Sequence, residues 1–317
     1  GGFSFVLSGE EKLYASRDPN GFRPLVIGKR GDAYVVASET CALDLIDADF
    51  IREVEPGEVV RLSKAGEIDS KFPFDRKQKA FCSFEPIYFS RPDSRHGNES
   101  VYNIRKRMGE VLAKEFPVDA DLVMAIPDSG VPMAIGYSQA AGIPLELGLI
   151  RNHYVGRTFI EPSQAIRDFG VKLKLNAVEG VLRDKKVVVI DDSIVRGTTS
   201  TKIVRMLRRA GVKEVHFRIG SPPITHSCFY GVSTPDRKRL MAAQVGVDRI
   251  RELLDADSLG YLSQKGLGTA LGEKGGEKHC MACFNGKYPV DIHADIEPQP
   301  TDGRGPGIFS TAKKVSG

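Results

Sequence analysis

The feature that constrains the fold most strongly is an apolar strand that leads directly into a polar loop and a helix. Residues 185–190 are Lys-Lys-Val-Val-Val-Ile, and a second strand-like run, Glu214–Ile219, follows after the helix. A run that is apolar at consecutive positions is typical of a strand covered on both faces, as in parallel sheets. Strand, helix and strand in this order form a βαβ unit. The sequence therefore predicts an α/β fold with a parallel sheet flanked by helices.

The chain divides into three regions of different character. Residues 1–72 alternate short strands with turns, which predicts a β-rich, antiparallel first domain. Residues 73–260 contain a long helical pattern at Val101–Glu115 and then alternate strands with helices, as α/β domains do. Residues 261–317 are an extension whose Gly-rich stretch predicts loops, with a disordered tail from residue 298 onward.

Charge and hydropathy exclude several classes of protein. The chain has 45 Lys and Arg against 41 Asp and Glu, a net charge of +4 that is too small to indicate nucleic-acid binding. The sequence shows neither an apolar run of about 18 residues nor a secretory pattern at its start. We therefore expect a cytoplasmic protein that binds neither nucleic acid nor membrane. Because residues 3–7 already form a strand pattern, we also expect the chain to begin inside a domain.

The loop after residues 185–190 has the composition of a phosphate site. Gly197 allows close approach of the backbone, and Thr198, Thr199 and Ser200 supply hydroxyl groups at the start of the helix. The N–H groups at a helix N-terminus carry partial positive charge and bind anions. Ligands in open α/β sheets bind at the carboxyl ends of the strands, where this loop lies. A monophosphate fits this loop.

Two adjacent acids, Asp191 and Asp192, open the same loop. They cannot serve the phosphate, because like charges repel, so their partners are sugar hydroxyls or a hydrated cation. The alternative for the pair taken alone is that Asp191 is a helix N-cap and the threonines are ordinary capping residues. A site that binds a phosphate next to a ribose accounts for both the acid pair and the Gly197–Ser200 loop.

Two further segments complete the candidate site. Residues 127–132, Pro-Asp-Ser-Gly-Val-Pro, follow an apolar strand, and Gly130 permits a tight turn whose N–H groups could face pyrophosphate; alone, this would be an ordinary turn. Residues 151–176 form a long connection with aromatic and basic side chains. Long connections of this kind are often lids over active sites, although a surface loop with incidental charges is the alternative.

Residues 191–200 resemble the phosphoribosyl-pyrophosphate motif of type I phosphoribosyltransferases, which has two acids followed by a Gly-Thr-Thr phosphate loop. Residues 151–160, Arg-Asn-His-Tyr-Val-Gly-Arg-Thr-Phe-Ile, are similar to the flexible loop of the glutamine phosphoribosylpyrophosphate amidotransferases. Further segments, at 16–25, 37–39, 56–58 and 84–94, resemble that family in the same order. The resemblance covers the chain to about Val290.

This resemblance implies a type I phosphoribosyltransferase fold and an amidophosphoribosyltransferase activity. Phosphoribosyl pyrophosphate and ammonia would give 5-phosphoribosylamine and pyrophosphate, the first committed step of de novo purine biosynthesis. Mg²⁺ would be held by Ser129, Asp191 and Asp192, and the two acids would also fix the ribose. The remaining implied contacts are, for the 5-phosphate, Ser193, Arg196, Gly197, Thr198, Thr199 and Ser200; for pyrophosphate, Asp128, Ser129 and Gly130; and for the lid, Tyr154, Arg157 and Lys174.

The family also implies partners and a second active site. Purine nucleotides would act as feedback inhibitors, and a homotetramer is the expected assembly. The family's amino-terminal domain is a glutaminase whose nucleophile is an amino-terminal cysteine, and residue 1 here is Gly. Residues 1–72 match only the later part of that domain, so we expect this chain to lack glutaminase activity and to use free ammonia. Asp18, Arg23 and Glu39 are then structural.

The chain has five cysteines, an odd number that favours metal ligands or reactive thiols over disulfides in the cytosol. The close pair Cys280 and Cys283 is compatible with zinc, a redox dithiol or a cluster. The resemblance implies that this pair joins Cys82 and Cys228 as ligands of a [4Fe–4S] cluster, with structural zinc as the alternative. Cys41 has no such match and is expected to be a small buried hydrophobic residue.

Two other functions are compatible with parts of the pattern. A salvage base phosphoribosyltransferase shares the acid pair and the Gly-Thr-Thr element. It does not share the amino-acid sequence of residues 154–160 or the four cysteines. A non-catalytic regulator that senses a phosphoribosyl nucleotide would call for a DNA-binding module and a basic face, and the sequence shows neither. Measured turnover separates these alternatives.

Overall fold

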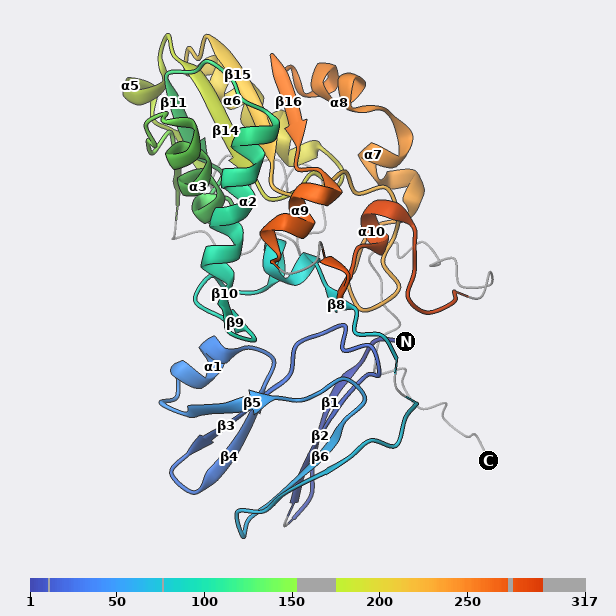
Figure 1. The fold of residues 1–317 in the computed structure, drawn as a ribbon. Helices are drawn as coiled ribbons and strands as arrows, with labels where there is room; N and C mark the ends of the chain where they lie inside the picture. Colours follow the sequence, from blue (N-terminus) through green and yellow to red (C-terminus); the bar gives the residue numbers. More distant parts are fainter. Residues whose placement is uncertain (11, 76, 153–174, 273–275, 293–317) are drawn as a thin grey trace, which may run out of the picture.

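The computed structural model describes residues 1–10, 12–75, 77–152, 175–272 and 276–292 of the 317. A β-rich region that holds the amino terminus lies below an α/β region in Figure 1. The expectations for the lid residues and for the tail from residue 298 fall outside the described residues.

The β-rich region consists of two antiparallel sheets that enclose a small core. One sheet has the order β1-β2-β6-β7 and the other β4-β3-β5. The prediction of an antiparallel first region is therefore confirmed, although its strands divide into two sheets. The elements are β1 (Ser4–Ser8), β2 (Lys12–Arg17), β3 (Val26–Arg30), β4 (Ala33–Ala37), α1 (Thr40–Asp44), β5 (Asp49–Glu53), β6 (Val59–Ser63) and β7 (Ile68–Lys71).

The α/β region is built on a parallel sheet of order β11-β14-β15-β16. Its strands are β11 (Leu122–Ala125), β14 (Lys186–Asp191), β15 (Glu214–Ile219) and β16 (Ser258–Tyr261). The longer helices are α2 (Val101–Glu115), α3 (Val131–Ala141), α6 (Thr198–Arg209), α8 (Val247–Leu254) and α9 (Gln264–Ala270). Helix α2 and strand β15 have the bounds that the sequence predicts. The predicted βαβ unit is confirmed as β14-α6-β15.

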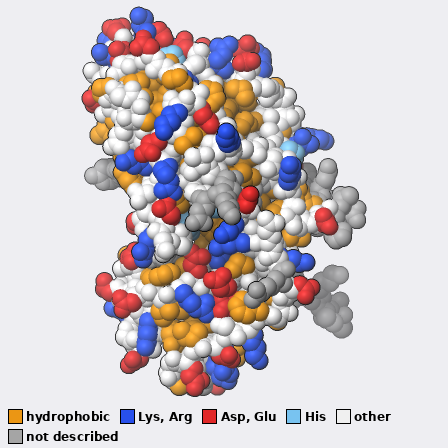
Figure 2. Space-filling view, viewed as in Figure 1, with side chains coloured by type: hydrophobic (Ala, Val, Ile, Leu, Met, Phe, Trp, Pro, Cys, Tyr) orange, Lys and Arg blue, Asp and Glu red, His pale blue; other side chains and the backbone are white. Residues whose placement is uncertain are grey.

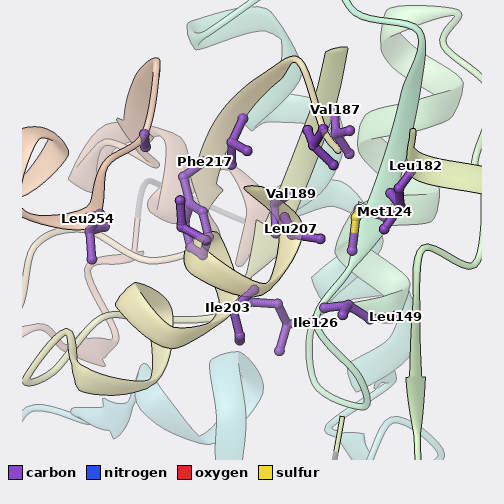
Figure 3. Packing of buried hydrophobic residues seen from close by; sticks show 14 of the residues in the cluster. Met124, Ile126, Leu149, Leu182, Val187, Val189, Ile203, Leu207, Phe217 and Leu254 are labelled. Atoms are coloured by element: carbon purple, nitrogen blue, oxygen red, sulfur yellow. The ribbon is translucent and has the colours of Figure 1, made fainter. Parts of the chain in front are cut away.

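Strand β14 is apolar at consecutive positions because helices cover both of its faces. Val187 and Val189 pack with α6 and α8 in one hydrophobic core, which Figure 3 shows from close by. Val188 and Ile190 pack with α2, α3 and α9 in another. Successive strand side chains point to opposite faces, so only a sheet covered on both sides buries all four. The sheet is therefore the middle layer of three.

Shorter elements connect these layers. They are β8 (Phe81–Cys82), the π-helical turn η1 (Glu85–Phe89), β9 (Arg95–His96), β10 (Glu99–Ser100), β12 (Leu149–Arg151), β13 (Leu175–Ala177), α5 (Glu179–Leu182), η2 (Arg237–Arg239), α7 (Met241–Gln244), β17 (His279–Cys280) and α10 (Ala282–Asn285). Strand β17 pairs in parallel with β8, which joins the carboxyl-terminal extension to the segment that follows the β-rich region.

The expectation that the stretch beyond residue 260 consists of loops is wrong, because α9 and α10 lie there. Ser263 caps α9 by accepting a hydrogen bond from the Gly266 amide. A Cβ atom built at Gly266 would lie 2.5 Å from Oε1 of Glu115. This glycine therefore permits close packing on α2 rather than a turn, and burial of Leu267 and Ala270 stabilises the helix.

The surface shown in Figure 2 carries basic and acidic side chains interspersed with hydrophobic ones. This mixture agrees with the small net charge of the chain. In the described ranges, none of the helices combines the length and the apolar character needed to cross a membrane.

Helices α2 and α3 approach each other through two glycines, and this contact supports the loop between β11 and α3. A Cβ atom at Gly109 would lie 1.9 Å from the carbonyl oxygen of Met133, and one at Gly136 would lie 1.9 Å from that of Lys106. Backbone atoms cannot yield as a flexible side chain can. The two helices can therefore pack this closely only with glycine at these positions.

Gly109→Ala is expected to reduce the free energy of unfolding by about 3 kcal/mol, because the added methyl group forces α2 and α3 apart. The matched control is Gly180→Ala in α5, where a Cβ atom would meet nothing within 4 Å. That control is expected to change the free energy by less than about 1 kcal/mol. Urea unfolding monitored by circular dichroism measures both, and equal effects would contradict the packing account.

Candidate functional site

The two predicted loops meet at the carboxyl ends of β11 and β14. These strands are neighbours, and the Ile126 amide donates a hydrogen bond of 2.8 Å to the carbonyl oxygen of Ile190. The hydroxyl of Ser129 donates a hydrogen bond of 2.5 Å to Oδ1 of Asp192. The structure therefore brings together the acid pair and the Ser129 turn, which are 62 or more positions apart in the sequence.

Asp191 and Asp192 are buried at the end of β14, with 8% and 6% of their surface exposed. Burial raises the pKa of both carboxyl groups, and the charge of Asp192 raises that of Asp191 further. Hydrogen bonds from Ser129 and from the Ser193 hydroxyl, the latter 2.6 Å to Oδ2, favour the ionised form of Asp192. Two adjacent buried acids of this kind need a cation or sugar hydroxyls as partners before both can be ionised.

The oxygen atoms at this position suit a magnesium ion. Mg²⁺ prefers oxygen ligands and is commonly held by one or two carboxylates together with substrate phosphates. Ser129, Asp191 and Asp192 supply two carboxylates and one hydroxyl from the two loops. The residues present therefore fit a site in which the substrate completes the coordination.

The loop before α6 has the backbone shape that a phosphate site requires. Gly197 is in the left-handed region, with φ of 73°, and precedes the first turn of α6. Thr198 and Thr199 are exposed in that turn, whereas Ser200 is buried. The first N–H groups of a helix lack acceptors within the helix, so this exposed turn can bind an anion. Arg196 is exposed beside it.

The Ser129 turn lies directly on the end of β14. A Cβ atom at Gly130 would lie 2.7 Å from the carbonyl oxygen of Ile190, so glycine allows the turn to approach the strand. Asp128 forms an exposed ion pair with Arg151 at the end of β12. The sequence did not predict this ion pair, which joins the turn to the start of the long connection.

The proposed lid contacts Tyr154, Arg157 and Lys174 lie outside the described residues. The strands on either side of this segment, β12 and β13, form an antiparallel pair in which Arg151 is opposite Leu175. Residues 151 and 175, on either side of this segment, therefore lie next to each other.

Four of the five cysteines gather near the junction of the two regions. Cys82 and Cys280 are register partners in the parallel pair β8 and β17, and Cys283 lies in α10. Electrostatic interactions connect Cys283 with Cys82, Cys228 and Cys280, so the four thiols form one group. Burial raises the pKa of Cys82 to about 12 and that of Cys280 to about 11, and it raises the pKa of Cys283 as well.

These thiols fit a bound metal centre better than a reactive pair. A reactive thiol has a lowered pKa, whereas a metal displaces the proton from a coordinating thiol whatever its pKa. Within the part of the chain that the structure describes, no three His, Cys, Asp or Glu side chains are placed to hold one metal ion. As they lie, the four thiols do not form a single-ion site.

The three residues expected to be structural hold turns and contacts between regions. Asp18 accepts hydrogen bonds from the amides of Asn20 and Phe22. Arg23 forms an ion pair of 2.9 Å with the buried Glu85. Glu39 accepts hydrogen bonds from the Arg91 amide and the Ser94 hydroxyl. Cys41 is buried, with 7% exposed, as expected of a small hydrophobic residue.

Sequence reasoning missed Arg105, a buried cation near the acid pair. It lies on α2 with 1% of its surface exposed, and its charge favours the ionised form of Asp192. The signal was present, because Arg105 is next to Ile104 and one turn before Met108 and Gly109 on the face that α2 buries. A charged residue on the buried face of a helix is unusual and calls for a partner.

Comparison with known proteins agrees with this geometry. Residues 96–219 match the family model described as the phosphoribosyl transferase domain. This region has the phosphoribosyltransferase fold. The match begins in β9, includes both loops of the site and ends with β15.

The similarity to individual proteins extends over nearly the whole chain. The amidophosphoribosyltransferase of Bacillus subtilis is 51% identical over 298 residues, which are 93% of this chain and 62% of that protein. Amidophosphoribosyltransferase 2, chloroplastic, of Arabidopsis thaliana is 57% identical and aligns with 100% of this chain and 56% of its own length. The chain therefore spans a little over half the length of these relatives.

A solved structure shares the fold. The glutamine phosphoribosylpyrophosphate amidotransferase of B. subtilis, complexed with ADP and GMP, superposes with a TM-score of 0.86 at 51% identity, covering 93% of this chain and 65% of that one. The β-rich region followed by an α/β region with a parallel sheet is thus an arrangement that a known enzyme also has.

Gly197→Ala is expected to reduce the free energy of unfolding by about 2 kcal/mol, about half from left-handed strain and the rest from displacing the flexible end of the Met241 side chain. A Cβ atom there would lie 2.3 Å from Sδ of Met241. Gly272→Ala is the matched control, since its φ of 76° is similar and a Cβ atom would meet nothing within 4 Å. The control carries only the strain, about 1 kcal/mol. Thermal unfolding of both variants tests the difference, and equal losses would contradict the contact with Met241.

Proposed function

We propose that this chain carries the phosphoribosyl-transfer activity of an amidophosphoribosyltransferase. The observation that carries the proposal is the hydrogen bond between Ser129 and Asp192, which joins the two loops into one site. A phosphoribosyl pyrophosphate molecule has a phosphate at one end, a ribose in the middle and a diphosphate at the other. The α6 loop, the acid pair and the Ser129 turn offer matching groups in that order. The relatives with 51% and 57% identity carry the amidophosphoribosyltransferase name.

Each end of the substrate would be held by backbone and hydroxyl groups. The 5-phosphate would bind the first turn of α6, where N–H groups and the helix dipole favour an anion. Diphosphate would bind the turn of Asp128, Ser129 and Gly130. The further proposed contacts of the 5-phosphate are Ser193, Arg196, Gly197, Thr198, Thr199 and Ser200. Holding both ends fixes C1 of the ribose between them, which lowers the entropic part of the barrier.

The acid pair would act on the ribose. Asp191 and Asp192 would accept hydrogen bonds from the ribose hydroxyls, and their negative charge would stabilise positive character at C1 as the bond to diphosphate breaks. Magnesium bound between Ser129 and the acids would supply charge stabilisation of the leaving diphosphate. Tyr154, Arg157 and Lys174 are proposed to contact the substrate and exclude water from C1.

Ammonia is the proposed nucleophile of the transfer. The five cysteines of this sequence begin at Cys41, and the four others form the thiol group at the junction, so none of these thiols is proposed as a glutaminase nucleophile. In the proposed reaction, the lone pair of ammonia forms the bond to C1, diphosphate leaves with the bonding electrons, and a proton passes to solvent.

Regulation, assembly and location follow the relatives in the proposal. The B. subtilis structure is complexed with ADP and GMP, and we propose purine nucleotides as inhibitors here. A homotetramer is the proposed assembly. The cytoplasm is the proposed compartment, with the chloroplast as the alternative because the Arabidopsis relative is chloroplastic.

A [4Fe–4S] cluster is the proposed occupant of Cys82, Cys228, Cys280 and Cys283. Four thiolates suit either a cluster or zinc. Cys82, Cys228, Cys280 and Cys283 stand at the positions that resemble the cluster ligands of the family, and this resemblance supports the cluster. In the proposal this site joins the carboxyl-terminal extension to the junction and takes no part in the reaction.

Pyrophosphate release from phosphoribosyl pyrophosphate and Mg²⁺ tests the activity. The anaerobically purified chain is expected to release pyrophosphate with ammonium chloride and not with glutamine. Asp192→Asn is expected to reduce kcat/KM on the order of a hundredfold, because one charge that stabilises C1 is lost. Absence of release with either nitrogen source, in folded protein that holds its metal centre, would refute the activity. Release only with a purine base would indicate a salvage enzyme.

Metal analysis tests the thiol site. Iron and acid-labile sulfide in equal amounts are expected in the wild-type chain, and Cys283→Ala should lose both. Removing the centre with a chelator should lower the thermal midpoint, because the centre is part of the folded structure. Cys41→Ala is the matched control and should keep the full metal content, since Cys41 is buried away from the other four thiols. Zinc in place of iron would contradict the cluster.

A further inference from the structure

The turn that is proposed to bind diphosphate carries an acidic side chain. Asp128 is its first residue, and 63% of its side chain is exposed. The backbone of the turn is held in place, because the Ser129 hydroxyl donates a hydrogen bond to Asp192 and the Gly130 amide donates one of 3.2 Å to the carbonyl oxygen of Ile126. An exposed carboxylate repels an anion that approaches it. The turn therefore suits diphosphate only where another group offsets this charge.

The guanidinium of Arg151 offsets the charge of Asp128 in the structure. Nη1 of Arg151 forms an ion pair with Oδ2 of Asp128. The two residues come from different elements, since Arg151 is the last residue of β12, so the pair forms only in the folded chain. A guanidinium has five N–H donors, and an ion pair through one nitrogen leaves donors for a second anion. The pair therefore does not exhaust the binding capacity of Arg151.

Strand β12 places this guanidinium at the turn. Leu149 is buried, with 4% of its surface exposed, in the core that also holds residues of β11 and β14. A Cβ atom at Gly148 would lie 2.7 Å from Sδ of Met124, so the chain before β12 lies directly on β11, the strand that leads to the turn. Pairing with β13 holds Arg151 opposite Leu175. The backbone of Arg151 is therefore held in place, while its side chain, 40% exposed, can follow a ligand.

An exposed ion pair of this kind contributes little to the stability of a fold, because water screens both charges. Its effect on an anionic ligand is larger. Without Arg151, the carboxylate of Asp128 would face the diphosphate with its full negative charge. With Arg151 the net charge of the pair is zero, and arginine bonds phosphate oxygens as readily as carboxylate oxygens. The ion pair therefore makes sense as a device for ligand binding.

We propose that Arg151 is a positioning residue for the diphosphate end of the substrate, which offsets the charge of Asp128 and so lets the backbone of the 128–130 turn accept diphosphate. The inference rests on the proposed function, because it takes Mg²⁺-phosphoribosyl pyrophosphate as the ligand. It assigns a role in substrate affinity to β12, which lies outside both loops of the site.

A purely structural role for the ion pair makes a different prediction. If the pair only held β12 against the turn, loss of either partner would break it, and both single variants would bind the substrate equally poorly. Loss of both partners would then restore nothing. In the charge account the single variants act in opposite directions, because Arg151→Gln exposes a negative charge and Asp128→Asn removes it. The double variant should then recover most of the affinity.

The experiment measures the dissociation constants of Mg²⁺-phosphoribosyl pyrophosphate and of Mg²⁺-pyrophosphate by isothermal titration, together with KM and kcat with ammonia. Arg151→Gln is expected to raise KM and both dissociation constants about tenfold, with a smaller change in kcat. Asp128→Asn is expected to lower both dissociation constants about threefold. The double variant is expected to recover to within about threefold of the wild type.

The matched control is Arg183→Gln, which removes an exposed arginine from an ion pair with Glu179 in α5. Arg183 precedes β14, whereas the proposed site lies at the carboxyl end of that strand. The control variant should therefore bind both ligands as the wild type does. Thermal unfolding of every variant identifies any loss of binding that comes from misfolding.

The outcomes separate the inference from the proposed function. Equal losses in the two single variants, or a double variant that binds no better than Arg151→Gln, would overturn the positioning role. Unchanged binding in folded Arg151→Gln would overturn it as well, and so would weaker binding in folded Asp128→Asn. In each of these cases a wild-type chain that binds the substrate and turns it over leaves the proposed function intact. A wild-type chain that binds neither ligand would overturn the proposed function and the inference with it.

Discussion

The burial of two adjacent acids at the end of an apolar strand is the constraint on which the rest of this site depends. Asp191 ends β14 and Asp192 follows it directly, and residues 187–190 of this strand pack into both hydrophobic cores. Carboxyl groups in such a place raise the energy of the empty protein unless protons, hydrogen-bond donors or cations accompany them. Ser129 and Ser193 supply donors to Asp192, and Arg105 supplies charge. A cation or sugar hydroxyls at the acid pair would offset the rest of the energetic cost of burying the two charges.

The same constraint explains why glycines and small residues surround the acids. Gly130 brings the Ser129 turn against the end of β14, and Gly197 turns the chain from the acids into α6. Gly109 and Gly136 allow α2 to lie close on α3, the helix that follows the turn. Binding groups must be held within a fraction of an ångström, and rigid elements achieve this better than loops. The packing of α2 on α3 is therefore part of the site as well as of the core.

The junction between the two regions is built on the short strand β8. On one side the amide of Cys82 donates to the carbonyl oxygen of Phe22 in the β-rich region. On the other side β8 pairs with β17, which brings Cys280 beside Cys82. The ring of Phe22 stacks on that of Tyr230, with centroids 4.1 Å apart, two residues after Cys228. The four thiols therefore lie where three segments of the chain meet. A metal centre bound there would stabilise the fold by joining all three segments.

The sequence predicted the elements whose signal is local and missed those that depend on distant contacts. The β14-α6-β15 unit was predictable because β14 is apolar from Val187 to Ile190 and a polar loop and a helix follow it directly. The family resemblance placed Ser129 with Asp191 and Asp192. The structure explains their contact, since β11 and β14 are neighbours and the carboxyl ends of parallel strands share one edge. Helix α9 was missed because Gly266 indicates a turn until Glu115, far away in the sequence, is seen to occupy the space of a side chain.

The partners of Arg105 and the pairing of Cys82 with Cys280 were beyond local signals for a similar reason. The face that α2 buries around Arg105 can be seen in the sequence, but not the carbonyl groups that the arginine meets there. Strands β8 and β17 have two residues each, which is too short for any periodicity, so only the family resemblance brought these cysteines together.

A crystal structure of the chain with Mg²⁺ and a non-hydrolysable analogue of phosphoribosyl pyrophosphate tests the central claim most directly. The account predicts the 5-phosphate at the first turn of α6, the ribose hydroxyls on Asp191 and Asp192, and the diphosphate on the turn of Asp128, Ser129 and Gly130. It also predicts the metal ion between Ser129 and the acids. Ligand density elsewhere, or a phosphate on only one of the two loops with the acids unoccupied, would contradict the claim that these loops form one substrate site.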